Sequence, residues 1–598
     1  MDNPRDNEGE MTVQFTRIKT ALTLALGALL LTACQRDDAG ATAVQTAPAP
    51  AEAPAIIVDT LYYGGPIVTV DDAQPSVEAV AVKDGRIHAV GDLSAMESLV
   101  GPDTRKVDLA GRTLSPGFVD GHVHVNFLGM QAVGANLLAP PDGDVETIDD
   151  VVASLSDWAA STEDDDRMGW IFGMGFDDAV LAERRFPDRD DLDRVSTDMP
   201  VMAIHISGHF ASVNSKALEM IGYNADTPDP EGGIIRRRPG SSEPNGVLEE
   251  LAAIPAMMKY LTPRNIEDAE YFTRKGLEMA MSFGYTTAQE GRAFAPAHDG
   301  MVAYAEKYGF PIDVVSYIDY SDRTPLASDW YGPGYRSGYR VGGLKITLDG
   351  SPQGRTAWRT EPYLLPPDGQ GPDYAGYPAI PDDQVVIDLV DEAYRKGWQV
   401  LMHANGDAAV DQMIRAIAPA QEKYGPGDRR HTLVHGQYTR LDQLDELAEL
   451  QIVGSFFPMH TFYWGDWHSE LIGPEKAQHI SPTRSALNAG MRITSHTDAP
   501  VALPNLMQVM WATVNRVTRS GKVLGAEERL TPEEALKAVT LWGAWQHFED
   551  DDKGSITPGK RADLVILSDN PLTIEPMRLN EIVVLETIKD GNTVWRRE

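Results

Sequence analysis

The stretch GFVDGHVH, residues 117–124, decides the fold of this chain, because a short apolar strand runs directly into two histidines. Residues i and i+2 of a β-strand project from the same face, so His122 and His124 can present both imidazoles to one metal ion. Taken alone, the pair is equally compatible with ordinary polar filler in a strand. The rest of the sequence has to distinguish the two interpretations.

Seven later segments share this design of an apolar strand that ends in polar residues. They are YTTAQEG (285–291), DVVSYID (313–319), GLKITLDG (343–350), WQVLMHANG (398–406), HTLVHGQ (431–437), IVGSFFP (452–458) and RITSHTDAP (492–500). Helical stretches such as QVVIDLVDEAYRKG and TRLDQLDELAEL alternate with them, which favours parallel strands joined by crossover helices. We therefore expect an α/β fold, a (β/α)8 TIM barrel over residues 116–552, with the active site where the strands end.

Two regions fall outside this pattern. Residues 57–115 and 553–598 both read as short strands and turns, and we expect one small β-sandwich domain built from both ends of the chain, with two separate β-domains as the alternative. Between the first two barrel strands, at about residues 130–280, lies far more chain than a crossover needs. We interpret it as a large insertion that covers the site.

The amino-terminal segment has the character of an export signal. Basic residues precede the apolar run ALTLALGALLLTA, which is too short to span a bilayer comfortably and ends at Cys34, the only cysteine. We predict a lipoprotein signal peptide over residues 1–34, starting at Met1 or Met11, then lipidation of Cys34 and an Ala/Pro-rich tether over residues 35–56. The alternative is a chance cysteine after an uncleaved anchor.

This signal places the protein in the cell envelope of a bacterium, lipid-anchored and facing the periplasm, and Gln35 hints at the outer membrane. The formal net charge of -37 repels phosphate groups, so we expect no nucleic acid as a partner and contact with the membrane only through the anchor. No P-loop, Rossmann fingerprint or Gly-x-Ser-x-Gly elbow supports nucleotide, nicotinamide or serine-hydrolase chemistry.

Three more strand ends carry residues that bind metals. His403 closes QVLMH, His435 closes HTLVH and Asp498 lies in ITSHTD. Four imidazoles and a carboxylate on one rim suit a zinc-type site better than a structural purpose, because unligated polar groups would need other partners. Lys345 lies inside an apolar strand, where a free ammonium is costly to bury unless it is paired or chemically modified.

Six motifs together resemble the amidohydrolase superfamily, in particular the branch of N-substituted formamide deformylases and YtcJ-like proteins. They are PGFVDGHVH, GLKITLDG, MHANGD, LVHGQ, SHTDAPV and GSITPGKRADLVIL, and the likeness covers roughly residues 57 to 598. The resemblance implies one or two divalent ions, with Zn2+ the expected metal. It implies these ligands: His122, His124 and Asp498 for a first ion, His403 and His435 for a second, and Lys345, as N6-carboxylysine, for the bridge between them.

The resemblance further implies an enzyme that hydrolyses a C–N bond other than a peptide bond, in a small-molecule amide, formamide or cyclic amide. Metal-activated hydroxide would attack the carbonyl, and Asp498 would accept the proton and pass it to the leaving nitrogen. Two alternatives stay open: a dipeptidase- or lactonase-like hydrolase on the same site, and a non-catalytic ligand-binding lipoprotein. A homodimer is expected only by analogy with related barrels.

Four further residues are candidate substrate contacts, each with a structural alternative. His209 contacts substrate from the insertion or caps a turn, and Arg355 binds a carboxylate or amide oxygen or tethers a lid. His496 faces the site two residues before Asp498, where hydrogen bonding is favoured over direct ligation. Trp464 belongs to an aromatic cluster that either clasps an apolar substrate or packs against the insertion or a second subunit: Phe456, Phe457, His460, Phe462, Tyr463, Trp464 and Trp467.

Overall fold

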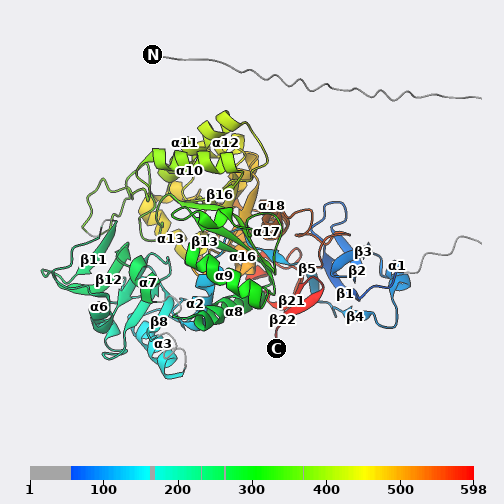
Figure 1. Cartoon of the computed structure of the whole chain (residues 1–598), viewed down its shortest axis with the longest axis horizontal. Coiled ribbons are helices and arrows are strands. Elements are labelled where there is room, and N and C mark those ends of the chain that lie inside the picture. The colour runs from blue at the N-terminus through cyan, green and yellow to red at the C-terminus, as the bar shows by residue number, and fades with distance from the viewer. Residues whose placement is uncertain (1–55, 162–168, 231, 261–263, 368) are drawn as a thin grey trace, which may run out of the picture. The chain divides into compact units, whose positions relative to one another are not determined.

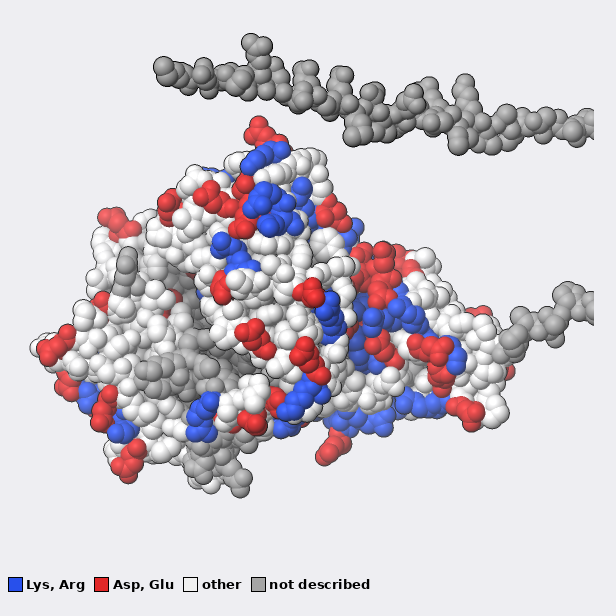
Figure 2. Space-filling view, in the orientation of Figure 1, with Lys and Arg blue, Asp and Glu red and all other residues white. Residues whose placement is uncertain are grey.

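The computed structural model describes residues 56–161, 169–230, 232–260, 264–367 and 369–598. The predicted signal peptide, Cys34 and almost all of the predicted tether lie outside these residues. Among the residues that are described, no helix is both long and apolar enough to cross a membrane. On the face drawn in Figure 2, basic side chains lie among the acidic ones, so the acidic excess forms no continuous acidic surface there.

A curled sheet of eight parallel strands forms the (β/α)8 barrel (Figure 1). The strands pair in chain order, each with the next. They are β6 (Phe118–Val119), β13 (Tyr285–Ala293), β14 (Asp313–Asp319), β15 (Tyr339–Thr347), β16 (Gln399–Ala404), β17 (Thr432–His435), β18 (Val453–Phe456) and β19 (Ile493–Ser495). Each overlaps a segment in which the sequence predicts a barrel strand, and the predicted fold class is confirmed.

The barrel closes between its last and first strands, just beyond the ends of both. The backbone N–H of Asp498 donates to the carbonyl oxygen of His122 at 3.1 Å, and that of His124 donates to the carbonyl oxygen of Ala499 at 3.0 Å. Residues that follow β6 and β19 are therefore held against each other, although more than 350 positions separate them in the chain.

Helices alternate with the strands along the chain and cover the barrel. They are α2 (Val125–Val133), α8 (Ile266–Ser282), α9 (Ala295–Lys307), α10 (Asp383–Lys396), α11 (Asp407–Tyr424), α12 (Leu441–Glu449), α13 (His460–Ile472), α15 (Thr483–Asn488), α16 (Leu506–Asn515), α17 (Pro532–Ala538) and α18 (Leu541–Gln546). The ends of α10 follow from its sequence. Asp382 caps the first turn by accepting a hydrogen bond from the N–H of Gln384, and Gly397 ends the helix with a left-handed φ of 72°.

Strands from both ends of the chain form one β-domain, and Figure 1 shows the N-terminal and C-terminal strands side by side. The sheet runs β22-β21-β20-β5-β1-β2-β3, with β4 paired to β1. Its strands are β1 (Thr60–Val68), β2 (Ser76–Lys83), β3 (Arg86–Gly91), β4 (Arg105–Asp108), β5 (Thr113–Pro116), β20 (Leu564–Leu567), β21 (Val584–Lys589) and β22 (Asn592–Arg596), with α1 (Leu93–Met96) after β3. The antiparallel pairing of β5 with β20 excludes the alternative of two separate β-domains.

Alternation along β20 joins this domain to the barrel. Leu564 and Ile566 pack into the core of the β-domain, whereas Val565 and Leu567 pack into the main core that the barrel and its helices share. Successive strand residues face opposite sides, so one short strand contributes to both cores.

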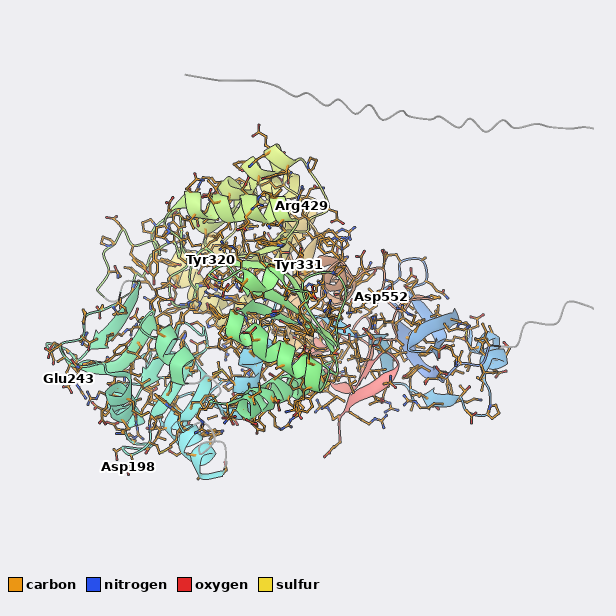
Figure 3. All side chains as sticks on the ribbon, in the orientation of Figure 1. Asp198, Glu243, Tyr320, Tyr331, Arg429 and Asp552 are labelled. Atoms are coloured by element: carbon orange, nitrogen blue, oxygen red, sulfur yellow. The ribbon has the colours of Figure 1, made fainter. Side chains whose placement is uncertain are left out.

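The insertion between β6 and β13 is a folded unit with a six-stranded sheet of order β11-β12-β10-β9-β8-β7. Asp198 and Glu243, labelled in Figure 3, belong to it. Its elements are β7 (Ala135–Asn136), α3 (Ile148–Ser161), β8 (Ile171–Phe176), α5 (Arg189–Leu192), β9 (Val201–His205), β10 (Phe210–Val213), α6 (Ser215–Ile221), β11 (Gly233–Arg237), β12 (Pro244–Glu250) and α7 (Ile254–Tyr260).

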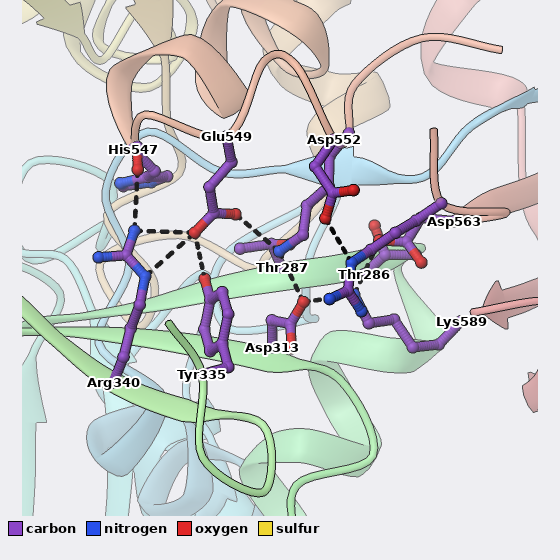
Figure 4. Close-up of polar contacts among 12 residues, drawn as sticks. Thr286, Thr287, Asp313, Tyr335, Arg340, His547, Glu549, Asp552, Asp563 and Lys589 are labelled. Carbon is purple, nitrogen blue, oxygen red and sulfur yellow. Dashed lines mark hydrogen bonds and ion pairs between the residues drawn. The ribbon is translucent and has the colours of Figure 1, made fainter. Parts of the chain in front are cut away.

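A buried ionic network joins the amino-terminal ends of the barrel strands to the C-terminal part of the chain (Figure 4). Nζ of Lys553 lies 2.6 Å from Oδ2 of Asp313 and 2.6 Å from Oε2 of Glu549. Nζ of Lys589 lies 2.5 Å from Asp313, and Nη2 of Arg340 lies 2.8 Å from Glu549. Asp313 begins β14, so the network lies at the end of the barrel that supports stability rather than catalysis.

Candidate metal centre

The two histidines of GFVDGHVH lie just beyond β6, and not within the strand as the sequence pattern suggests. β6 ends at Val119, and His124 is the extended N-cap residue of α2. Because the backbone at His124 is still extended, the rings of His122 and His124 remain neighbours, with centroids 4.8 Å apart.

The other predicted ligands gather around this pair. The ring centroid of His435 lies 5.5 Å from that of His122 and 4.5 Å from that of His403. Oδ1 of Asp498 lies 3.6 Å from Nε2 of His122 and 3.5 Å from Nε2 of His124. Oδ2 of Asp498 lies 3.8 Å from Nδ1 of His435. These donor atoms are close enough for one divalent ion to contact several of them.

Lys345 completes the cluster from β15. Its side chain is buried, and Nζ lies 3.2 Å from Nε2 of His122. Burial lowers the pKa of this amine to about 7, because a charge is costly away from water. The structure thus brings all six predicted metal ligands to one place.

The protonation of three of the four histidines suits ligation. Burial lowers the pKa values of His122, His403 and His435 well below that of a free imidazole. Burial also lowers the pKa of His124, but contacts with Asp498 and Glu290 outweigh this effect and raise it. A neutral imidazole is the form that binds a metal.

Buried polar groups and backbone strain both fit a divalent metal at this cluster. Both ring nitrogens of His496 are buried and have no hydrogen-bond partner within the described part of the chain. His435 and Asp498 adopt left-handed φ values of 75° and 51°. Such conformations cost on the order of 1–3 kcal/mol outside glycine and gather at functional sites. A nitrogen-rich donor set suits zinc better than calcium or magnesium, which prefer oxygen.

Two residues of β13 that orient the histidine pair were not identified from the sequence. Oε1 of Gln289 lies 2.6 Å from Nδ1 of His122, and Oε1 of Glu290 lies 3.5 Å from Nδ1 of His124. Gln289 is hydrogen-bonded to Nδ1, Glu290 lies on the Nδ1 side of its histidine, and both histidines have Nε2 on the side of Asp498. Their only signal in the sequence is the polar end of the strand YTTAQEG.

Asp120, inside GFVDGHVH, was also missed. Its Oδ2 accepts hydrogen bonds from the hydroxyl groups of Tyr285 at 2.5 Å and Thr497 at 2.8 Å, and its Oδ1 accepts one from the backbone N–H of His122 at 2.9 Å. Burial raises the pKa of Asp120 to about 7. The carboxyl group thus links the residues that follow β6 and β19 to the first residue of β13.

Two of the four predicted substrate contacts lie at the cluster. The buried ring of His496 has its centroid 5.4 Å from that of His122 and 5.1 Å from that of His435. The ring of His209 reaches the cluster from the insertion, with its centroid 6.4 Å from that of His403.

The other two predicted contacts are engaged by protein groups. Nη1 of Arg355 donates to the carbonyl oxygens of Leu365 at 3.2 Å and Pro366 at 3.0 Å. Trp464 is buried, and its Nε1 donates to Oδ2 of Asp177 at 2.8 Å. Both contacts correspond to the structural alternatives, a tethered loop for Arg355 and packing against the insertion for Trp464.

A second group of possible metal donors, Asp177, Asp178 and His205, lies in the insertion. Nε2 of His205 is 3.2 Å from Oδ1 of Asp178, and Nδ1 is 2.9 Å from Oγ of Ser207. Asp177 accepts the hydrogen bond from Trp464. Because these groups already have protein partners, the cluster serves as a link between the insertion and α13.

The chain matches the model of the amidohydrolase family over residues 105–595. It is similar to the putative amidohydrolase YtcJ of Bacillus subtilis (strain 168), with 26% identity over 553 residues that cover 90% of this chain and 99% of that protein. It is also similar to the N-substituted formamide deformylase of Arthrobacter pascens, with 27% identity over 564 residues that cover 90% of this chain and 98% of that protein.

A solved structure, that of an uncharacterized metal-dependent hydrolase from Pyrococcus horikoshii OT3, has the same fold. The TM-score is 0.68 at 23% identity, and the match covers 86% of this chain and 99% of that one. These matches confirm the resemblance inferred from the six sequence motifs.

Proposed function

The chain belongs to the amidohydrolase family and is a hydrolase, and we propose that it is a metal-dependent one that cleaves a C–N bond in a non-peptide amide, formamide or cyclic amide. The observation that carries the proposal is the meeting of four imidazoles, Lys345 and Asp498 at the carboxyl ends of the barrel strands. The similarity to a formamide deformylase supports the type of bond.

The proposed ligands divide into two groups, one for each ion. His122, His124 and Asp498 would hold one divalent ion, preferably Zn2+, and His403 and His435 would hold a second. When bound, a divalent ion polarises the substrate carbonyl and supplies a nucleophile from water at neutral pH.

Lys345 would join the two positions as a carbamate. Its amine is buried and carries a lowered pKa, so the neutral form needed to attack carbon dioxide is accessible. The nitrogen forms a bond to the carbon of CO2 and releases one proton, and the product is a carboxylate in place of an ammonium. A carboxylate is a better metal ligand than an ammonium and removes the cost of a buried cation.

Asp498 would move the proton of the reaction. Its two carboxylate oxygens face different histidines of the cluster, so it can take a proton from the attacking water on one side and release it on the other. An amine is a poor leaving group until its nitrogen is protonated, which makes this transfer necessary for C–N cleavage.

The test combines metal analysis with a substrate screen on the purified protein. N-acyl, N-formyl and lactam compounds are assayed beside dipeptides and lactones. We expect bound zinc and hydrolysis of at least one C–N substrate class. Turnover of lactones or dipeptides alone would favour those alternatives, and substoichiometric metal with no hydrolysis would favour a binding lipoprotein.

We also propose that the enzyme is anchored through a lipid on Cys34 and acts in the periplasm. The support is the sequence alone, an apolar run that ends at a single cysteine followed by a tether. Cys34→Ala should leave the precursor unprocessed, and its full-length mass is the readout. Normal processing of the variant would contradict the anchor.

A further inference from the structure

The insertion brings a histidine and a glutamate together beside the metal centre. His209 precedes β10 and Glu250 ends β12, two strands that pair in antiparallel register. The backbone N–H of Glu250 donates to the carbonyl oxygen of His209 at 2.9 Å. The side chains meet as well, because Nδ1 of His209 lies 2.8 Å from Oε2 of Glu250.

The barrel holds the other side of Glu250. Its Oε1 accepts a hydrogen bond from Oγ1 of Thr356 at 2.9 Å, and Thr356 lies in the loop after β15, the strand of Lys345. Glu250 is buried and has a left-handed φ of 46°. A buried carboxylate with both oxygens engaged on a strained backbone is the arrangement expected of a residue that fixes a neighbour in one orientation.

The free side of His209 is directed away from Glu250. Its side chain keeps 21% of its surface accessible, and its ring is a neighbour of His403. In the described part of the chain, Nε2 has no hydrogen-bond partner. Since Glu250 occupies Nδ1, Nε2 is the nitrogen left for a ligand.

We propose that Glu250 is a positioning residue, which holds His209 so that Nε2 contacts a polar group of the substrate beside His403. The inference rests on the proposed function and deepens it, because the insertion then supplies part of the substrate site as well as its cover. The contact selects substrates with a hydrogen-bonding group next to the bond that is cleaved. A pair that only fastens the insertion to the barrel would affect stability and not kinetics.

The test compares His209→Ala, Glu250→Ala and the double variant in the metal-loaded full-length enzyme. Glu249→Gln is the matched control, because Glu249 is the preceding residue of the same strand and pairs instead with Arg236. Each single variant should lower kcat/KM about 10- to 100-fold, which is the loss typical when a supporting partner of a functional histidine is substituted. The double variant should be no worse than His209→Ala, because the two residues act as one unit.

Metal content and the melting temperature separate positioning from folding. We expect wild-type metal content in all variants, and Glu250→Gln should recover part of the activity because its amide oxygen can still accept from Nδ1. The proposal would be overturned if the losses in kcat/KM of the two single variants multiply in the double variant. It would also be overturned if Glu250→Ala has wild-type kinetics. A loss of activity that follows from lost metal would overturn it as well.

A second measurement does not depend on finding a substrate. In 15N-histidine NMR spectra of the zinc-loaded protein, the signal that His209→Ala removes should report a proton on Nδ1. Glu250→Ala should change that signal, and Glu249→Gln should not. If the wild-type enzyme cleaves no C–N substrate, the proposed function fails, while the spectra still decide whether Glu250 orients His209.

Discussion

Asp498 meets His122 at two points: its backbone N–H donates to the carbonyl oxygen of His122 at 3.1 Å, and its Oδ1 lies 3.6 Å from Nε2 of His122. The first contact closes the barrel and the second builds the proposed metal centre. Closure of the barrel and the geometry of the metal centre are therefore coupled, because a shift of either residue would change both.

Asp498→Asn should abolish turnover, with kcat falling by about 100- to 10,000-fold, because the amide cannot accept the proton of the attacking water. The assay is run at saturating zinc, and bound metal is measured on the same sample. Near-wild-type activity in a metal-loaded variant would rule out Asp498 as the proton carrier.

Lys345→Met should lower the metal content, because methionine keeps the apolar stem but cannot become a carbamate. The metal-free variant should unfold at the same temperature as the metal-free wild type or higher, since a buried amine has been removed. Lys553→Met is the control, because Lys553 is equally buried but bound to Asp313 and Glu549 far from the cluster. The control should lose stability and keep its metal, and unchanged metal in Lys345→Met would exclude the bridging role.

Gly291→Ala should weaken metal binding although the change adds one methyl group. A Cβ at Gly291 would lie 2.2 Å from Cε1 of His122, a ring that Gln289 holds in place. We expect zinc affinity, measured by competition with a chelator, to fall about 10-fold or more. Gly300→Ala in α9 is the control, where nothing lies within 4 Å of the added Cβ. Equal zinc affinity of the two variants would show that the ring can move freely.

Glu549→Gln should destabilise the fold at pH 7 by about 3–5 kcal/mol, because it leaves Arg340 and Lys553 incompletely compensated. These cations outweigh the effect of burial and lower the pKa of Glu549 in the folded state. The contribution of Glu549 to the free energy of unfolding is therefore fully present above its pKa in the unfolded chain, about 4.3. It is lost as the pH falls through the lower pKa of the folded state. Urea unfolding at several pH values should show that the difference in unfolding free energy between Glu549→Gln and the wild type shrinks below about pH 4.3.

Glu533→Gln is the matched control for this network, because Glu533 is exposed and pairs with Lys537 on the same helix. The substitution should lower the free energy of unfolding by less than about 1 kcal/mol at every pH. A pH-independent effect at Glu549 would show that the lost stability comes from packing and not from charge.

The barrel was predictable because two independent signals coincide in the sequence. Apolar runs of strand length recur with helical stretches between them, and the polar residues of each run fall at its end, where His403, His435 and Asp498 lie. Strand order then follows from chain order. The metal ligands could be named because histidine and aspartate side chains at the ends of buried strands are costly unless they bind a partner.

The residues that orient the ligands could not be named in the same way. Gln289 and Glu290 lie in a strand more than 160 positions after the histidines they contact, and Glu250 meets His209 between two strands of the insertion sheet. Their residue types are common in solvated loops, and periodicity assigns a face but not a neighbour. The extended backbone beyond β6 was misjudged for a related reason, because strand assignment depends on pairing partners elsewhere in the chain.

The pairing of Thr113–Pro116 with Leu564–Leu567 also constrains how the protein is made. The N-terminal strands leave the ribosome first, but their partner follows more than 400 residues later. Until then one edge of that sheet stays open and able to pair with other chains, which makes it a site of possible aggregation in the nascent protein. Truncation near the C-terminus would therefore damage the beginning of the chain as much as its end.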